Sequence, residues 1–166
     1  MLICAEFVEL YDRNVTTMNS YQGGVYQQAI SGVTNLNNSW YDGKQYQKYA
    51  FEYTPGSKGS VTWWVGEQAT WTLDARAMGP NGNIGQRVVP EEPMAIIINF
   101  GMSNGFAALN LTGLAPLMPA TMRLDYVRIY QDEGNEIMTC DPPGYPTTDY
   151  IAKHPEPYNN PNMTHW

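Results

Sequence analysis

The chain has 166 residues, of which 43% are apolar and 15% charged, so it is long enough for one domain with a core and too apolar for a disordered segment. Its net charge of −7 and the absence of any run of basic residues exclude nucleic acid as a partner. No stretch approaches the roughly 20 apolar residues that span a bilayer, and the N-terminus lacks the basic start of a signal peptide.

The first half of the chain is predicted to form strands separated by turns. Residues 25–34 are β-prone and follow two glycines, and residues 46–53 alternate with a period of two. Residues 61–66 and 69–74 are separated by a short turn, so we expect them to form a hairpin. The alternation in residues 46–53 predicts that one set of side chains is buried, namely Gln47, Tyr49, Phe51 and Tyr53.

The second half continues the pattern. Residues 79–83 are dense in turn residues and predict a surface loop, whereas the apolar run 93–100 is typical of a strand covered on both faces. Residues 124–131 alternate again and predict a last strand. The Pro-rich residues 140–166 contain too many prolines for a ladder, so we expect an extended arm after a β-domain of residues 1–139. The pattern indicates an all-β sandwich or jelly roll.

Cysteines, histidines and glycosylation motifs say little about chemistry. Cys4 and Cys140 can pair with each other in an oxidising compartment or find partners elsewhere. His154 and His165 are isolated, so neither a zinc site nor a catalytic triad is indicated. Asn-x-Ser/Thr motifs that would accept glycans in a lumenal compartment begin at Asn14, Asn37, Asn110 and Asn162.

Several stretches resemble one family. Residues 124–131 are similar to the closing strand of family 16 glycoside hydrolases, and residues 92–101 to their strand ending in Asn-Leu. The segments that resemble the fungal branch tied to β-1,6-glucan synthesis are 16–24, 26–31, 139–142 and 145–151. The likeness runs from about Glu6 to Trp166. The resemblance implies a concanavalin-like jelly roll of two curved antiparallel sheets, the concave one forming a glycan cleft, of which this chain would supply the C-terminal part.

The resemblance also implies a location. The proteins of that branch resemble type II membrane proteins with a cytosolic tail, one membrane span and a lumenal family 16 domain. We therefore expect the secretory pathway or plasma membrane, on the lumenal or extracellular side. Membrane association is expected only through a segment that is not present in this chain.

The carboxylates of a glycoside hydrolase are not found. Retaining enzymes need two carboxylic acids about 5 Å apart, and family 16 places them on one strand as Glu-x-Asp-x-Glu or Glu-x-Asp-x-x-Glu. Glu6 and Glu9 come nearest, but a spacing of three puts them on opposite strand faces and no Asp lies between them. No catalytic residue is therefore predicted. By the resemblance, the carboxylate strand lies upstream of the first residue of this chain.

Binding residues can still be suggested. Trp63 and Trp64 are consecutive, so one should face the core and the other should be able to stack on glucose, unless both rings are buried. Asn99 borders the cleft in the resembled fold, although a structural Asn beside a turn fits equally well. Asp125 matches a position that contributes to a structural calcium site in some family 16 enzymes; a salt bridge to Arg123 or Arg128 is the alternative. No other cofactor is expected.

Three hypotheses for the function follow, with β-glucan polysaccharide as the expected partner. The first is β-glucan biosynthesis or remodelling, with β-1,6-glucan favoured, by a family 16-type glucosidase or transglycosylase whose catalytic strand is absent here. The second is a non-catalytic glucan-binding module. The third is an inactive, truncated remnant.

Overall fold

The computed structural model describes residues 5–24, 29–41, 43–80, 84–105 and 107–165. The chain divides into two compact units, Met1–Glu91 and Glu92–Trp166, and each is described by itself. The boundary expected between residues 139 and 140 falls inside the second unit and stays a prediction.

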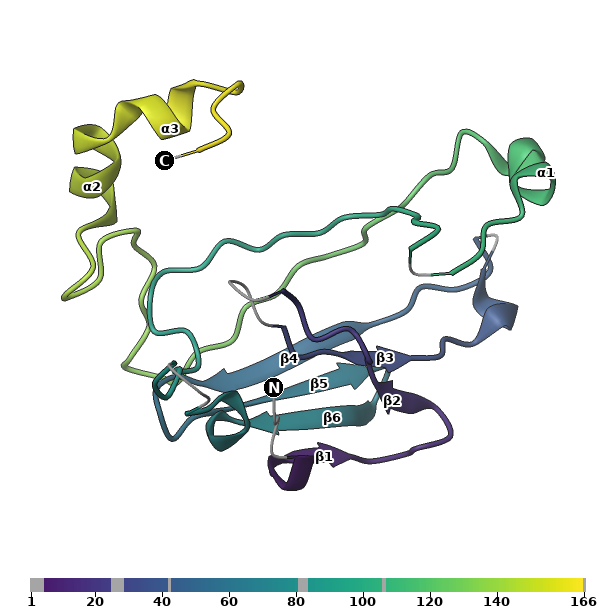
Figure 1. Cartoon of the computed structure of the whole chain (residues 1–166), viewed down its shortest axis with the longest axis horizontal. Helices are drawn as coiled ribbons and strands as arrows, with labels where there is room; N and C mark the ends of the chain where they lie inside the picture. The colour runs from purple at the N-terminus through teal and green to yellow at the C-terminus, as the bar shows by residue number, and fades with distance from the viewer. Residues whose placement is uncertain (1–4, 25–28, 42, 81–83, 106, 166) are drawn as a thin grey trace. The chain divides into compact units, whose positions relative to one another are not determined.

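A four-stranded antiparallel sheet organises the first unit. Its order is β1 (Val8–Leu10), β6 (Gln68–Asp74), β5 (Ser60–Val65) and β4 (Tyr49–Thr54), as Figure 1 shows. The predicted hairpin is confirmed as β5 and β6, which are joined through Gly66. Gly66 has a φ of 67°, which a two-residue hairpin turn requires at its first position and which glycine adopts without steric cost.

A second sheet has two strands, β2 (Thr16–Met18) and β3 (Gly32–Thr34). Thr16 lies opposite Thr34, and their hydroxyl oxygens are 3.0 Å apart. The strand predicted at 25–34 is thus confirmed only at its end. Residues 29–31 are not in a strand, and residues 25–28 lie outside the described part of the chain.

The core of the first unit lies on one face of the larger sheet. Its buried residues are Trp71, Leu73 and Ala77, and the Trp71 ring stacks on Trp63 with centroids 4.0 Å apart and planes 5° apart. The partly buried residues packed against this cluster are Phe7, Val8, Leu10, Met18, Ile30, Trp63 and Met78. Since Met18 belongs to β2, the smaller sheet covers this face. Burial of a large apolar side chain such as that of Trp71 stabilises the fold by about 1.5–3 kcal/mol.

The predicted burial along residues 46–53 is wrong. Tyr49, Phe51 and Tyr53 share the core face of the sheet but are 62%, 60% and 42% exposed. Gln47 is half-buried and precedes the strand. The reason is position: β4 is an edge strand, while the core cluster is centred on β6, two strands away. An alternating pattern identifies the face of a strand but not whether anything covers it.

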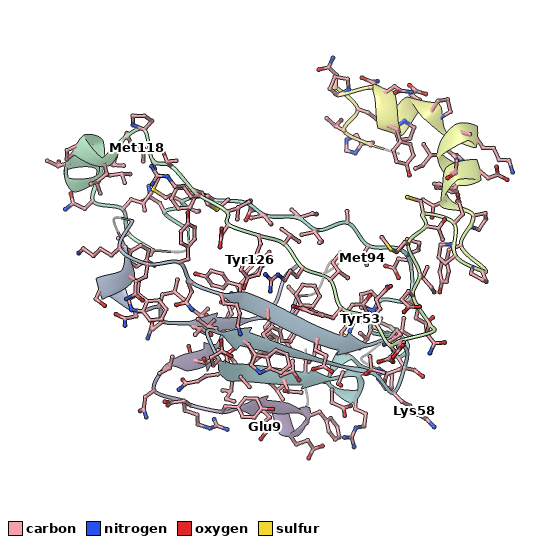
Figure 2. The ribbon with its side chains drawn as sticks, turned by 180° about the vertical axis from the view of Figure 1, so that it is seen from behind. Glu9, Tyr53, Lys58, Met94, Met118 and Tyr126 are labelled. Atoms are coloured by element: carbon pink, nitrogen blue, oxygen red, sulfur yellow. The ribbon has the colours of Figure 1, made fainter. Side chains whose placement is uncertain are left out.

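The strands predicted at 93–100 and 124–131 are also wrong. Both segments lack strand structure, and their apolar side chains are exposed, including Met94 at 61%, Ile97 at 85% and Tyr126 at 52% (Figure 2). An apolar run becomes a strand only where a neighbour completes its hydrogen-bond ladder. The described residues of the second unit supply no such neighbour for these two segments.

Short helices complete the chain. The first unit has the 3₁₀ helices η1 (Ala5–Phe7), η2 (Asn38–Trp40) and η3 (Ala75–Met78), and the second has α1 (Leu111–Leu114), η4 (Ala115–Leu117), α2 (Thr147–Lys153) and α3 (Pro155–Asn159). No helix in the described ranges has the length and apolar character needed to cross a membrane.

The two C-terminal helices correct the prediction of an arm that is extended throughout residues 140–166. Asp141 accepts hydrogen bonds from the backbone N–H and the hydroxyl of Thr148, at 2.7 and 2.6 Å, which ties residues before α2 to its first turn. Pro155 occupies the first turn of α3, where a missing N–H removes no helical hydrogen bond. Prolines that exclude a β-ladder are therefore compatible with short helices. Strand residues outnumber α-helical residues, which agrees with the predicted all-β class, and both sheets are open.

Candidate binding surface on the four-stranded sheet

Trp63 and Trp64 lie on opposite faces of β5. Trp63 packs in the core against Trp71, whereas Trp64 lies opposite Ala50 of β4 and Ala69 of β6. A β-bulge between the two tryptophans shifts the register, and the Thr70 hydroxyl fixes it by donating to the Trp63 carbonyl at 3.1 Å. Both residues directly opposite Trp64 are alanines, and its indole is half-buried.

A row of polar side chains crosses the same face as Trp64. Glu9, Thr72, Thr62 and Glu52 lie opposite one another in register on β1, β6, β5 and β4. The Thr72 hydroxyl is 2.7 Å from that of Thr62 and 3.0 Å from that of Tyr11. Hydroxyl groups both donate and accept, and the carboxylates at the two ends accept. An aromatic ring beside such a row can take the apolar face and the hydroxyls of a sugar.

This surface was only partly predictable. The sequence indicated that one of the two tryptophans faces away from the core, and the structure identifies it as Trp64. The threonines and Glu9 were missed as candidates. The signal available was the alternation of Thr70 and Thr72 with Trp71 and Leu73, but the register that places Thr72 beside Thr62 is not visible in one sequence.

Three described acidic residues have lowered pKa values. The pKa of Asp74 is lowered by its hydrogen bonds from Arg76, and that of Asp141 by its hydrogen bonds from Thr148. The pKa of Glu136 is lowered by backbone hydrogen bonds, chiefly from its own N–H and also from Gly134. A general acid in a glycosidase needs the opposite shift, because it must hold its proton near neutral pH.

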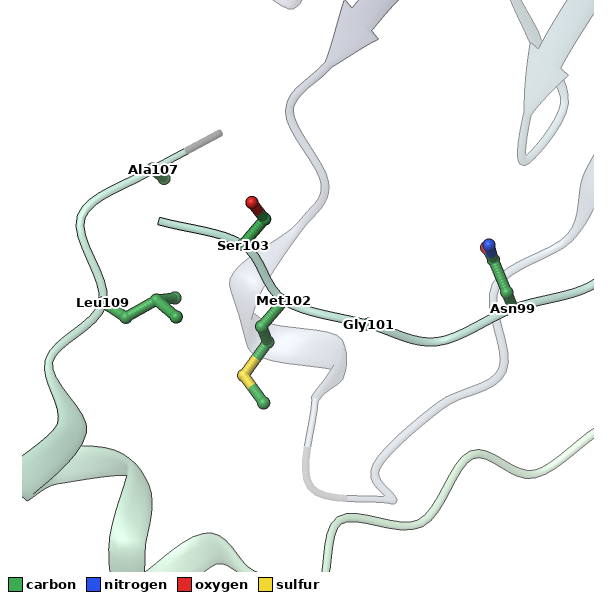
Figure 3. Close-up of a pocket in the computed structure, with 6 residues that line it drawn as sticks. All are labelled: Asn99, Gly101, Met102, Ser103, Ala107 and Leu109. Atoms are coloured by element: carbon green, nitrogen blue, oxygen red, sulfur yellow. The ribbon is translucent and has the colours of Figure 1, made fainter. Parts of the chain in front are cut away.

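Asn99 belongs to the second unit, whereas Trp63 and Trp64 belong to the first. It lines an open hollow of about 410 Å³, shown in Figure 3, together with Gly101, Met102, Ser103, Ala107 and Leu109. The hydroxyl oxygen of Ser103 accepts from Gly105 N–H at 3.1 Å, so this side chain fixes the loop. The hollow offers few polar groups, and a binding role for Asn99 stays a prediction.

A calcium role for Asp125 stays a prediction. In the described ranges, no three His, Cys, Asp or Glu side chains come together, while calcium takes six or more oxygens. The alternative, a salt bridge from Asp125 to Arg123 or Arg128, does not form within 4.0 Å between these described residues. The pKa of Arg128 is raised chiefly by a hydrogen bond with Tyr130, although the Asp125 charge also contributes, and its guanidinium lies 4.4 Å from the centre of the Tyr126 ring.

The four glycosylation motifs have exposed asparagines, and their occupancy stays a prediction. Asn37 accepts hydrogen bonds from the N–H and hydroxyl of Ser39, at 3.0 and 2.7 Å, and Asn110 accepts one from Gly113 N–H at 3.0 Å. Cys140 is exposed and carries a free thiol, while Cys4 lies outside the described residues. Whether Cys140 pairs with Cys4 or with another cysteine stays untested.

The described structure defines an antiparallel β-protein with a row of hydroxyls beside one half-buried tryptophan on the same sheet face. Over residues 1–166 the chain matches the family model described as "Beta-glucan synthesis-associated protein SKN1/KRE6/Sbg1". The chain belongs to this family. The resemblance inferred from sequence to a fungal family of β-glucan synthesis is thus confirmed.

Individual relatives agree. The chain is 44% identical over 164 residues to the beta-glucan synthesis-associated protein SKN1 of Candida albicans, covering 96% of this chain and 22% of the relative. It is 45% identical over 166 residues to the corresponding KRE6 protein of Saccharomyces cerevisiae, covering 97% and 23%. The chain therefore spans about a fifth of the length of the curated relatives it matches. A comparison with solved structures gives no significant match.

Proposed function

We propose that this chain takes part in cell-wall β-glucan synthesis or remodelling by binding glucan on the sheet face that carries Trp64. The observation that carries the proposal is the indole of Trp64, flanked by Ala50 and Ala69 and lying on the same face as the hydroxyls of Thr62 and Thr72. Membership of a family named for β-glucan synthesis supports glucan as the polysaccharide. β-1,6-Glucan is the linkage that the sequence resemblance favours.

The chemistry of the face suits a sugar chain. A glucose ring presents C–H groups on its faces and hydroxyls at its rim, so it can stack on an indole while its hydroxyls exchange hydrogen bonds with threonines and carboxylates. Removing a tryptophan from the centre of an interface costs about 2 kcal/mol or more, which is a roughly 30-fold loss of affinity.

Co-sedimentation with insoluble glucans tests the proposal. The chain should be retained by β-1,6-glucan, and Trp64→Ala should weaken retention by roughly 30-fold. Trp63→Phe is the matched control, because it changes the neighbouring tryptophan on the core face and should leave retention unchanged. Circular dichroism verifies that both variants are folded. Retention of Trp64→Ala equal to that of the parent chain would refute the proposal.

We further propose that this chain supplies binding and not the acid chemistry of a family 16-type glucosidase or transglycosylase. Support comes from its acidic residues, which do not follow the Glu-x-Asp-x-(x)-Glu pattern. Incubation with β-1,6- and β-1,3-glucan should release no reducing ends above the buffer. Steady release that scales with protein concentration would overturn this part of the proposal.

We also propose a jelly-roll fold and a lumenal location for this chain, as the resemblance to family 16 implies. The two antiparallel sheets support the first, and the exposed sequon asparagines, such as Asn37, support the second. A crystal structure decides the first. Expression behind a secretory leader decides the second: a mass increase that an endoglycosidase removes is expected, and an unmodified chain would contradict it.

A further inference from the structure

The outer edge of the four-stranded sheet presents backbone N–H and C=O groups that point away from the sheet. β4 lies at that edge, and among the described residues the only strand with which it pairs is β5. The Lys48 carbonyl accepts from Gly66 N–H at 2.9 Å, which places Lys48 among the residues that bond to β5. Because such residues alternate along an antiparallel ladder, residues 49, 51 and 53 direct their N–H and C=O groups away from β5.

Charge is the feature that protects this edge against unspecific pairing, since Glu52 lies in β4 and Lys48 directly precedes it. Edge strands are commonly charged, short or bulged, or contain proline. β4 has six residues without proline, every one of them is exposed, and its pairing with β5 is regular. Tyr49 and Phe51, which carry outward backbone groups, are 62% and 60% exposed.

We propose that β4 pairs antiparallel with β4 of a second copy of this chain, with Tyr49 opposite Phe51. A two-fold pairing must place outward residues opposite outward residues, which leaves three central registers. In the first, residue 51 faces itself, and Lys48 faces Thr54. In the second, residue 49 faces residue 51, and Lys48 of each copy lies opposite Glu52 of the other. In the third, residue 51 faces residue 53, and Glu52 faces Glu52 of the other copy, which brings like charges together.

Charge complementarity selects the second register. It creates two Lys48–Glu52 pairs across the dimer axis, and opposite charges directly across strands are favourable. Lys48 already bonds to Glu67 of its own chain at 2.6 Å, but the two side chains are 40% and 87% exposed, so the ammonium can be shared between two carboxylates. The selected register also places the exposed aromatic side chains of the two copies side by side. Pairing of this kind does not depend on glucan binding by Trp64.

A charge-swap experiment tests the register. Sedimentation velocity of the 166-residue chain should show a monomer–dimer equilibrium that shifts with concentration. Glu52→Lys and Lys48→Glu each bring like charges together at two positions, so each should weaken dimerisation about tenfold or more. A mixture of the two variants should restore dimers, because each of their cross-strand pairs is then Lys opposite Glu. Glu67→Gln is the control and should still dimerise.

Backbone probes give a second test that does not depend on charge. Phe51→Pro removes an outward N–H and leaves the bonds to β5 intact, so it should abolish the dimer with little loss of stability, whereas Ala50→Pro should destabilise the sheet itself. In hydrogen exchange, the amides of residues 49, 51 and 53 should gain protection with concentration. A parent chain that stays monomeric at millimolar concentration, or mixed charge variants that stay monomeric, would overturn the proposal.

Discussion

Replacement of Gly32 by alanine tests how closely the small sheet packs on the core. A Cβ atom at this position would lie 3.0 Å from Nε1, 3.1 Å from Cε2 and 3.2 Å from Cδ1 of Trp71. The Trp71 ring cannot retreat easily, because the parallel ring of Trp63 lies 4.0 Å behind it. Overpacking of this kind costs about 1–3 kcal/mol.

Urea denaturation followed by tryptophan fluorescence measures this cost. With a slope of about 2 kcal/mol per molar urea, the midpoint of Gly32→Ala should fall by roughly 0.5–1.5 M. Gly85→Ala is the matched control, because a Cβ at that position meets no atom within 4 Å. It should leave stability unchanged or raise it by up to about 1 kcal/mol.

A double-mutant cycle decides whether the Trp71 ring is the cause. In a Trp71→Phe background the smaller ring leaves room for the added methyl group, so Gly32→Ala should cost less than about 1 kcal/mol there. An equal cost in both backgrounds would show that the methyl group is resisted by something other than the indole.

Three further outcomes are expected. Gly66→Ala should lower stability by about 1–2 kcal/mol in thermal unfolding, since φ is 67° at this position, and an unchanged Tm would contradict the assigned hairpin turn. Thr72→Val should cost about 0.5–1.5 kcal/mol by removing two hydroxyl contacts, while Thr72→Ser should keep most of that stability; equal losses would exclude the hydrogen bonds as the cause. Since the pKa of Asp141 is lowered in the folded chain, its contribution is present above the ordinary carboxyl pKa and lost as pH falls through the folded one. NMR titration should find that Thr148→Ala raises the Asp141 pKa, and no change would remove Thr148 as the cause.

The sequence predicted local elements better than long-range ones. The β5–β6 hairpin was predictable because alternation, β-prone residues and Gly66 all act within a few residues of each other. The pairing of Val8 with Leu73 was not, since nothing local marks which distant strand completes the sheet. The two strands predicted wrongly, at 93–100 and 124–131, have a related cause. The apolar pattern around Met94 and Tyr126 indicates a preference for burial, whereas a strand also needs a neighbouring strand to complete its hydrogen bonds.

For the candidate site, too, only the local part was predictable from the sequence. Consecutive tryptophans in a strand point to opposite faces, so the sequence predicted one ring on the face away from the core, with burial of both rings as the alternative. That Trp64 is the outward ring and has alanines on both neighbouring strands depends on register, which a single sequence does not contain. The calcium role of Asp125 was suggested by resemblance. Its salt-bridge partner could not be predicted, because the partner depends on which side chains surround Asp125 in the fold.

The pairing of β1 with β6 has a consequence for how the chain matures as it is made. Val8 leaves the ribosome before its partner Leu73, which follows 65 residues later. At 5–20 residues per second, β1 waits roughly 3 to 13 s for the strand it pairs with. The β5–β6 hairpin closes within microseconds once its residues emerge, so it is available as the template on which β1 is added last. Slowed elongation after residue 10 would lengthen the interval in which the Val8–Leu10 edge and the apolar side chains beside it are open to chaperones.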